Sequence, residues 1–442
     1  MTCGGVDHGK STLLGRLLFD SRSVPEDHLA LAKRDNDLDF SMLLDGLRAE
    51  REQGITIDVA YRYFRTNKRK FIIADAPGHE QYTRNMATAA SNCDLAVVLV
   101  DAREGIIEQT RRHSFIAALL GIKHLVIAVN KMDLVDRSEE RFDEIRRAYN
   151  AFAARLEVTD VEFIPMVAST GENVALRSPL MEWYGGRPLL DHLENVHIAS
   201  DRNLIDLRFP VQLILRGDDG SRHIAGTIAS GVVRVGDEVS VLPSQTTARV
   251  SRVSTGTEAF APLAVAVTLD RDVDVSRGDM LAHIHNIPTL GRDIEAMLVW
   301  MGAEPLRRGR EYLLQHCANQ VPAVVHEVRY RIDMTELRRH PADELQVNEI
   351  GRVHLEAARR IAFDTYGRNR ATGAFIVIDR MSGDTVGAGM IVSRETAAEE
   401  PATPRRSFAA IERLLADYGL DADAIGEITA KIASLLGSSH DG

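Results

Sequence analysis

The feature that most constrains this chain is a glycine-rich loop near its start that leads directly into a helix. Residues 4–11 have the sequence GGVDHGKS, which fits the pattern G-x-x-x-x-G-K-[ST], and the apolar stretch TLLGRLLF follows. Loops of this kind bind phosphate, because backbone N–H groups and the N-terminus of the helix face the anion. The loop therefore predicts an α/β domain, although the same pattern also occurs in plain turns.

Three further motifs follow in the order that a GTP-binding domain requires. Residues 50–57 read EREQGITI, residues 75–79 are DAPGH at the end of the apolar run FIIAD, and residues 130–133 are NKMD after HLVIAV. Asp75-Pro77-Gly78 alone is more often a simple turn. Four motifs in this order, two of them at strand ends, predict one guanine-nucleotide site.

The phosphates and a Mg²⁺ ion account for the first three motifs. We expect Lys10 to reach the β and γ oxygens, and the Ser11 hydroxyl to ligate Mg²⁺. Thr56 offers a second hydroxyl to the metal and a backbone contact to the γ-phosphate, which makes it the switch residue. Asp75 is expected to hold a Mg²⁺ water, and the Gly78 N–H to meet the γ-phosphate.

Two side chains are assigned to catalysis and to the base. His79 stands beside Gly78, where a side chain can orient the attacking water, although a lone histidine is usually idle. Asp133 can accept hydrogen bonds from the N1–H and the exocyclic amine of guanine, and adenine cannot donate both. The predicted catalytic residues are Lys10, Thr56 and His79, the metal ligands are Ser11, Thr56 and Asp75, and the nucleotide contacts are Gly4, Gly5, Val6, Asp7, His8, Gly9, Lys10, Ser11, Thr12, Asp75, Ala76, Pro77, Gly78, His79, Asn130, Lys131, Met132 and Asp133.

The pattern of apolar residues divides the chain into four parts. Residues 1–206 alternate apolar strands with amphipathic helices, which predicts a doubly wound α/β domain. Short β-branched runs broken by Gly and Asp predict one small β-barrel over residues 207–288 and a second over 289–393. Residues 394–442 are expected to form a linker and a short helical tail. Only three residues precede the glycine loop, so we expect most of the usual preceding strand to be missing and the fold to be weakened.

Composition excludes several classes of protein. The chain is 45% hydrophobic and 26% charged, as in soluble globular proteins, and neither a membrane-spanning run nor a signal peptide is apparent, so we expect a cytoplasmic protein. A net charge of -11 argues against a chain that coats nucleic acid. Cys3, Cys93 and Cys317 are expected to be buried small hydrophobes, and residues 111–113, RRH, a solvated helix face.

Three stretches carry a resemblance to a known family. They are LRAEREQGITIDVAYRYF, FIIADAPGHEQYTRNMATAASNCDLAVVLVDAREG and TRRHSFIAALLGIKHLVIAVNKMDLV. They resemble the translation-factor class of GTPases, and within it the large, GTPase subunit of heterodimeric bacterial sulfate adenylyltransferase. The specific features are QYTRNM at residues 81–86 and DVAYRYF at residues 58–64. The resemblance covers roughly residues 2–393.

The resemblance implies a function and partners. A protein of this family hydrolyses GTP in complex with a smaller catalytic subunit, which forms adenylyl sulfate and pyrophosphate from ATP and sulfate. A downstream adenylyl-sulfate kinase is a further expected partner. Some members carry that kinase as a fused domain, which needs about 150–200 residues. Only 49 residues follow Ser393, so we expect no fused kinase. The alternatives are a translation factor that delivers aminoacyl-tRNA and a stand-alone regulatory GTPase.

Three positions depart from the family pattern. His8 replaces the usual Asp of the glycine loop. Val167-Ala168-Ser169 replaces Ser-Ala-Leu, an element whose central N–H, here that of Ala168, is expected to face guanine O6. Arg360 replaces an apolar or proline position, and nothing in the sequence explains it. We expect His8 to leave GTP binding intact, and the change at residues 167–169 to leave binding with some loss of affinity.

Overall fold

The computed structural model describes most of the first 392 residues. The described residues are 1–24, 33–34, 37–38, 40–43, 59–77, 83–154, 156, 158, 160–198, 203–217, 220–333 and 337–392. The predicted linker and tail lie outside them, as do Thr56, Gly78 and His79. Among the described residues, no helix has the length and apolar character needed to cross a bilayer.

The amino-terminal domain is built on a six-stranded sheet with the strand order β4-β5-β1-β6-β7-β8. All neighbouring pairs are parallel except β4 with β5, which form an antiparallel edge hairpin. The strands are β1 (Thr2–Gly4), β4 (Ala60–Arg65), β5 (Lys70–Asp75), β6 (Leu95–Asp101), β7 (His124–Asn130) and β8 (Asp160–Pro165). The apolar runs FIIAD, DLAVVLVDA, HLVIAVNK and VEFIPMVA in the sequence correspond to β5, β6, β7 and β8.

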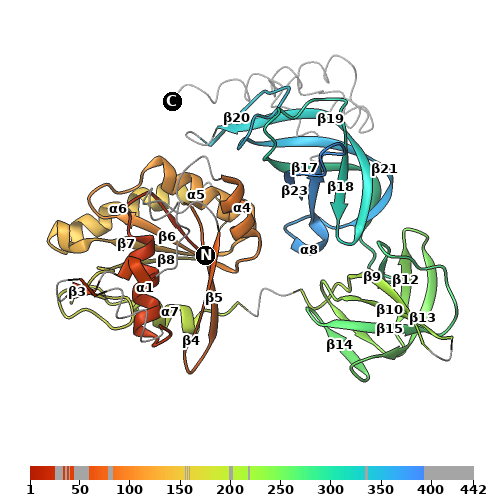
Figure 1. Ribbon diagram of the computed structural model, residues 1–442, viewed down its shortest axis with the longest axis horizontal. Helices are drawn as coiled ribbons and strands as arrows, with labels where there is room; N and C mark the ends of the chain where they lie inside the picture. Colours follow the sequence, from red (N-terminus) through yellow and green to blue (C-terminus); the bar gives the residue numbers. More distant parts are fainter. Residues whose placement is uncertain are drawn as a thin grey trace, which may run out of the picture. The chain divides into compact units, whose positions relative to one another are not determined.

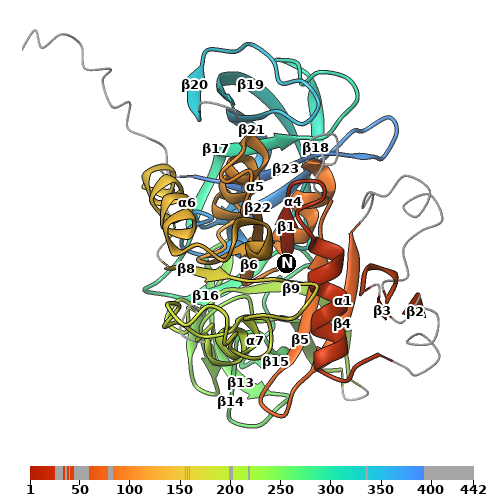
Figure 2. The same ribbon diagram turned by 90° about the vertical axis from the view of Figure 1, so that its left-hand side faces the viewer.

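Helices cover both faces of this sheet. Figures 1 and 2 show α4, α5 and α6 on one side, and α1 and α7 on the other. Strand β6 is buried at every position, because it lies in the middle of the sheet between the two helical layers. The remaining elements of the domain are α1 (Lys10–Asp20), β2 (Lys33–Arg34), β3 (Asp37–Leu38), η1 (Phe40–Leu43), α4 (Thr83–Ser91), α5 (Glu108–Leu119), η3 (Met132–Val135), α6 (Glu139–Ala153) and α7 (Leu189–Asn195).

The strand before the glycine loop is present, although it has only three residues. Its residues pair with β6 over their whole length, and Thr2 also pairs with Asp75 of β5. The amino group of Met1 is buried and donates to the Leu95 carbonyl at 2.8 Å. Because β5 has six residues and β6 seven, the expectation of a shortened central strand is confirmed, while the expected weakening of the fold stays a prediction.

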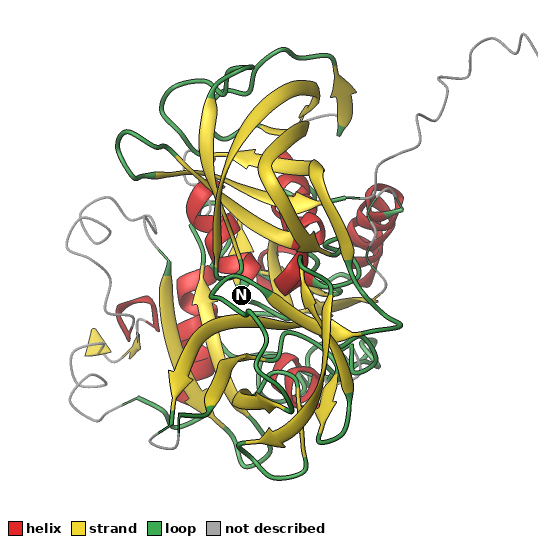
Figure 3. Cartoon of the chain, turned by 90° about the vertical axis from the view of Figure 1, so that its right-hand side faces the viewer, coloured by secondary structure: helices red, strands yellow, loops and turns green. Residues whose placement is uncertain are grey.

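The next part of the chain forms a closed barrel with the strand order β10-β15-β13-β12-β16-β9. Buried valines such as Val211, Val239 and Val267 fill it. Figure 3 shows the barrel regions as strands, whereas the helices gather around the sheet of the amino-terminal domain. The strands are β9 (Phe209–Arg216), β10 (Arg222–Thr227), β11 (Val232–Arg234), β12 (Glu238–Leu242), β13 (Thr246–Val253), β14 (Glu258–Phe260), β15 (Ala264–Leu269) and β16 (Met280–His283).

A second barrel follows, with the order β18-β22-β23-β17-β21-β19 and a further pairing of β18 with β19 that closes it. Trp300 and Tyr312 meet edge to face in its core, with ring centroids 5.6 Å apart. Its elements are β17 (Thr289–Trp300), β18 (Glu311–His316), β19 (Asn319–Asp333), β20 (Arg338–His340), β21 (Ile350–Phe363), α8 (Arg370–Gly373), β22 (Ala374–Ile378) and β23 (Thr385–Ile391). The predicted architecture of an α/β domain followed by two barrels is confirmed.

Buried polar contacts join these parts. Arg208 of the first barrel is fully buried and forms a two-pronged ion pair with Asp364 of the second, at 2.7 and 3.0 Å. The Tyr366 hydroxyl donates to the Leu120 carbonyl of the amino-terminal domain at 2.9 Å. Arg–carboxylate pairs with two parallel hydrogen bonds fix orientation as well as distance. The orientation of the two barrels relative to each other is therefore fixed by directional hydrogen bonds.

Two expectations about single residues need correction. Cys3 and Cys93 are buried as expected, but Cys317 is only half-buried, because it lies in the turn between β18 and β19. Within the stretch RRH, Arg111 is exposed as predicted, whereas His113 is only 2% exposed. Burial lowers the pKa of His113 to about 3, with the positive charge of Lys10 acting in the same direction.

Candidate functional site

The glycine loop connects β1 to α1 through two positions that favour glycine. Gly4 has φ +147°, and a Cβ there would lie 2.6 Å from the Leu99 carbonyl oxygen. Gly9 has φ +92°, and a Cβ there would lie 2.5 Å from Asn130 Nδ2. Gly9 is also the N-cap of α1, and no side chain caps this end of the helix. The first N–H groups of α1 are thus left for an anion, which the helix dipole also favours.

Lys10 places a buried cation inside the loop. Its Nζ donates to the carbonyl oxygens of Gly4 at 3.1 Å and Gly5 at 2.9 Å, and the residue is 8% exposed. It forms no ion pair with a carboxylate among the residues that the structure describes. Burial lowers the pKa of Lys10, and the nearby charge of Asp75 opposes the shift. A desolvated ammonium beside an open helix N-terminus is an arrangement that a phosphate group stabilises.

His8, the unusual residue of the loop, is tied to β6. Its ring lies 1% exposed, with Nδ1 3.0 Å from the Leu99 carbonyl oxygen and Nε2 3.1 Å from a Glu104 carboxylate oxygen. Both ring nitrogens therefore face acceptor oxygens. The side chain points into the domain, so the replacement of the usual Asp anchors the loop.

Asn130, at the end of β7, joins the two halves of the predicted site. Its Nδ2 donates to the His8 carbonyl at 2.9 Å, and its Oδ1 accepts from the Ala168 N–H at 2.9 Å. The residue is 3% exposed. The Ala168 N–H, which the sequence assigns to guanine O6, thus donates to Asn130 in this structure. A guanine contact from this N–H stays a prediction and would have to compete with Asn130.

The base-recognition motif continues from Asn130 on a constrained backbone. Lys131 adopts φ +61°, and its Nζ lies 2.9 Å from Asp101 Oδ2 at the end of β6. Burial alone would raise the pKa of Asp101, but hydrogen bonds from Arg103 and Lys131 outweigh it and hold the pKa below the usual range. Met132 is fully buried, whereas Asp133 is exposed at the start of η3. The motif thus anchors one side of Asp133 and leaves its carboxylate open to solvent.

The described residues of the predicted metal site carry oxygen atoms that can ligate a metal ion. Asp75 ends β5 next to β1, and its carboxylate accepts from the Thr2 hydroxyl at 3.0 Å. Ser11 lies half-buried in the first turn of α1, which follows β1 through the loop. Carboxylate, hydroxyl and water oxygens are the ligands that Mg²⁺ prefers, so these residues fit the ion. The other predicted contributors, Thr56, Gly78 and His79, lie outside the described residues.

The remaining predicted contacts complete the surroundings of the loop. Gly5 is buried, Val6 and Thr12 are half-buried, and Asp7 is exposed with φ +62°. Ala76 and Pro77, after β5, are buried.

Residues that support the site were missed by the sequence-based prediction. Asp101 holds Lys131, Glu104 holds His8, and Thr2 holds Asp75. Asp101 had a usable signal, since it ends the apolar run DLAVVLVD at the same edge of the sheet as Asn130. Glu104 and Thr2 had none, because their partners, His8 and Asp75, are distant from them in sequence.

Comparisons with known proteins agree with this geometry. The Elongation factor Tu GTP binding domain family matches residues 1–206, and the GTP-eEF1A C-terminal domain-like family matches residues 293–392. Fold and site together therefore define a GTPase of the elongation-factor class.

Individual relatives narrow the class. The chain is 48% identical over 419 residues to sulfate adenylyltransferase subunit 1 of Alteromonas mediterranea, covering 92% of this chain and 89% of that protein. It is 50% identical over 404 residues to the subunit 1 of Teredinibacter turnerae, covering 89% and 86%. The chain belongs to the sulfate adenylyltransferase subunit 1 family, which confirms the resemblance. It is also 53% identical over 410 residues to a bifunctional enzyme CysN/CysC of Rhodopirellula baltica, of which it spans 63%.

Proposed function

We propose that this chain is the GTP-hydrolysing regulatory subunit of a sulfate adenylyltransferase, which couples GTP hydrolysis to the formation of adenylyl sulfate and pyrophosphate from ATP and sulfate. The phosphate–sulfate anhydride is high in energy, so its formation needs a second, favourable reaction. No second nucleotide motif occurs in the sequence, so ATP and sulfate are assigned to the smaller catalytic subunit. The product is a substrate for an adenylyl-sulfate kinase, the further partner of the proposal.

One observation carries the nucleotide part of the proposal: the buried ammonium of Lys10 lies in the glycine loop at the open N-terminus of α1. The loop and the base motif are joined through Asn130, so phosphate and base are held by one connected structure. Asp133 at the exposed end of that structure is suited to guanine, since a carboxylate accepts from both of its donors.

The other site residues take the roles that the motifs suggest. Ser11, Thr56 and Asp75 would hold Mg²⁺ directly or through water, and His79 would orient the attacking water. When bound, Mg²⁺ neutralises charge that develops on the phosphate oxygens. Thr56 would become ordered with the γ-phosphate and relax after hydrolysis, and this change would carry the coupling. We assign residues 1–206 to the GTPase domain, 207–288 and 289–393 to the barrels, and 394–442 to the linker and tail.

The alternative of a translation factor that delivers aminoacyl-tRNA shares the class of fold. Identity of 48–50% to relatives named sulfate adenylyltransferase subunit 1, over most of both chains, favours the first function. Binding of tRNA that weakens steeply with salt would favour the second.

A pyrophosphate assay tests the proposal. The chain is combined with the small subunit, ATP and sulfate, and pyrophosphate is measured with and without GTP. We expect GTP to raise pyrophosphate formation, and Lys10→Ala to abolish the increase. Lys70→Ala is the control, because Lys70 is exposed on β5. Pyrophosphate formation that does not respond to GTP would refute the coupling, while tight GTP binding would still support the site.

A further inference from the structure

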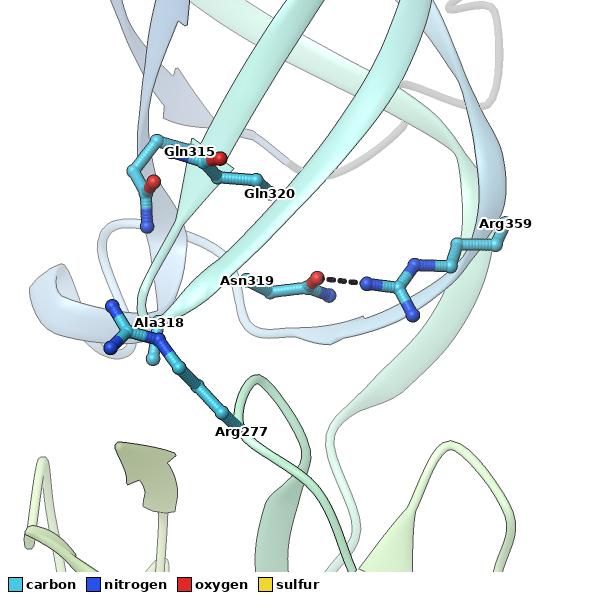
Figure 4. A pocket seen from close by; sticks show the side chains of 6 residues that line it. All are labelled: Arg277, Gln315, Ala318, Asn319, Gln320 and Arg359. Carbon is cyan, nitrogen blue, oxygen red and sulfur yellow. Dashed lines mark hydrogen bonds between the residues drawn. The ribbon is translucent and has the colours of Figure 1, made fainter. Parts of the chain in front are cut away.

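A pocket of about 320 Å³ lies where the two barrels meet, and none of its residues belongs to the nucleotide site. Figure 4 shows Arg277 reaching from the first barrel toward the turn between β18 and β19, with Arg359 on the opposite side pointing at Asn319. The pocket is lined by Arg277, Gln315, Ala318, Asn319, Gln320 and Arg359.

Two guanidinium groups in this pocket lack carboxylate partners. Arg277 makes no hydrogen bond or ion pair with any residue in the described part of the chain. Arg359 donates to Asn319 Oδ1, and no carboxylate lines the pocket. Asp279 acts on Arg359 through space, but its own carboxylate accepts from the Ser276 N–H at 2.8 Å. The pocket is therefore locally positive in a chain with a net charge of -11.

The third donor is the amide of Asn319, which is 8% exposed. Because Arg359 can only donate, it fixes Oδ1 of Asn319 toward itself and leaves Nδ2 as the second end of the amide. No acceptor for this Nδ2 is found among the described residues. A ligand oxygen in the pocket would therefore find this N–H group free to donate.

The two sides of the pocket are held in place. Gly278, next to Arg277, has φ +96°, and a Cβ there would lie 3.2 Å from the Asn319 Cα. The backbone beside Arg277 is therefore packed against the base of the β18–β19 turn. The buried pair Arg208–Asp364 also joins the barrels. The cations of the pocket are thus opposed across a fixed interface.

We propose that this pocket binds a compact tetrahedral oxyanion, either sulfate or a phosphate group, and that the bound anion bridges the barrels. Guanidinium groups match the oxygens of such anions in geometry and charge. Among the described residues that line the pocket, none carries an aromatic ring on which a nucleobase could stack, and Ala318 is the sole apolar one. The volume is about that of ten waters in the liquid, which holds an oxyanion with part of its hydration. This site is independent of the function proposed above.

Anion titration of the full chain tests the proposal. GDP and Mg²⁺ are kept saturating, so that the glycine loop is occupied, and binding of sodium sulfate and sodium phosphate is measured by calorimetry against sodium chloride at equal ionic strength. We expect saturable binding of one site per chain, with a rise in melting temperature beyond that seen with chloride. Preference for sulfate would identify a reactant of the proposed enzyme, and equal binding of phosphate a general oxyanion site; both support the proposal.

Two variants and a control locate the site. Arg277→Gln removes no hydrogen bond or ion pair found in the described part of the chain, so it should fold and bind GDP normally while binding sulfate about tenfold more weakly. Arg359→Gln should have a similar effect. Arg216→Gln, at an exposed arginine of β9 with no partner in the described part of the chain, should retain sulfate binding.

Equal sulfate affinity in the wild-type chain and Arg277→Gln would overturn the proposal. So would an equal loss in Arg216→Gln, since that result indicates a general charge effect. The proposal would also be contradicted if the pocket bound an acidic side chain of the partner subunit but neither free sulfate nor free phosphate. None of these measurements depends on pyrophosphate formation, so failure of the anion-site proposal can be distinguished from failure of the proposed function.

Discussion

Replacing Asn130 with alanine tests whether the two halves of the nucleotide site depend on one side chain. The change leaves two buried groups without partners, the His8 carbonyl and the Ala168 N–H, each lying 2.9 Å from Asn130 in the wild type. An orphaned buried group costs about 1–3 kcal/mol, so we expect Asn130→Ala to lower the free energy of unfolding by about 3 kcal/mol. For a domain of this size that is a fall in melting temperature of roughly 6–12 °C.

Calorimetry of the nucleotide-free chain measures this change, and titration with GDP measures its effect on binding. We expect weaker GDP affinity as well, because both loops lose their common support. Asn150→Ala is the matched control: Asn150 is exposed on α6, where alanine is the better helix former, so its melting temperature should stay nearly unchanged. A melting temperature of Asn130→Ala within about a degree of the wild type, with normal GDP affinity, would refute the reasoning.

Four further predictions address single groups. Asp133→Asn should weaken GTP binding about 100-fold or more in calorimetry and favour xanthosine triphosphate, whose carbonyl can accept from the amide. His79→Ala should bind GTP normally but hydrolyse it about 100-fold more slowly in single turnover; an unchanged rate would leave His79 without a role. Burial lowers the pKa of His113 to about 3, so the folded protein binds fewer protons at this residue than the unfolded chain does. The contribution of neutral His113 to the free energy of unfolding is therefore complete above about pH 6.5 and is lost as the pH falls from there toward 3. Melting curves of His113→Gln should show a shallower loss of stability over that range. Arg208→Met should cost about 3–5 kcal/mol in urea unfolding by stranding Asp364, and an added Asp364→Leu should recover much of it.

The sequence predicted the fold correctly wherever the pattern of apolar residues in a strand matches the burial that its position in the sheet requires. Strands β6 and β7 are continuous apolar runs, because a parallel strand between two helical layers is buried on both faces. The barrels were predicted from short β-branched runs. The residue count predicted a short β1, but not that Thr2 pairs with both β5 and β6. His113 was misjudged because its neighbours Arg111 and Arg112 suggested a solvated face, whereas helical spacing turns it inward.

The motifs predicted where Lys10 and Asp133 lie along the chain, but not what holds these segments in place. Spacing places Lys10 in the loop and Asp133 after β7. It gives no information on the hydrogen bonds from Asn130 to His8 and Ala168, which join segments far apart in the chain. Such bonds depend on three-dimensional register, and their donors and acceptors are mostly backbone atoms, which leave no trace in residue identity.

Strand β6 explains how separate motifs become one site, although it contributes no residue to any of them. Its Leu99 carbonyl lies 3.0 Å from His8 Nδ1 and fits closely against Gly4, so it positions the glycine loop. Two residues further on, Asp101 pairs with Lys131 and positions the base motif. Strand β6 is buried throughout and paired on both sides, so it is a well-supported reference for the two loops. If a change of bound nucleotide moved either the glycine loop or the base motif relative to β6, that segment would also move relative to the other one, while β6 itself kept its place.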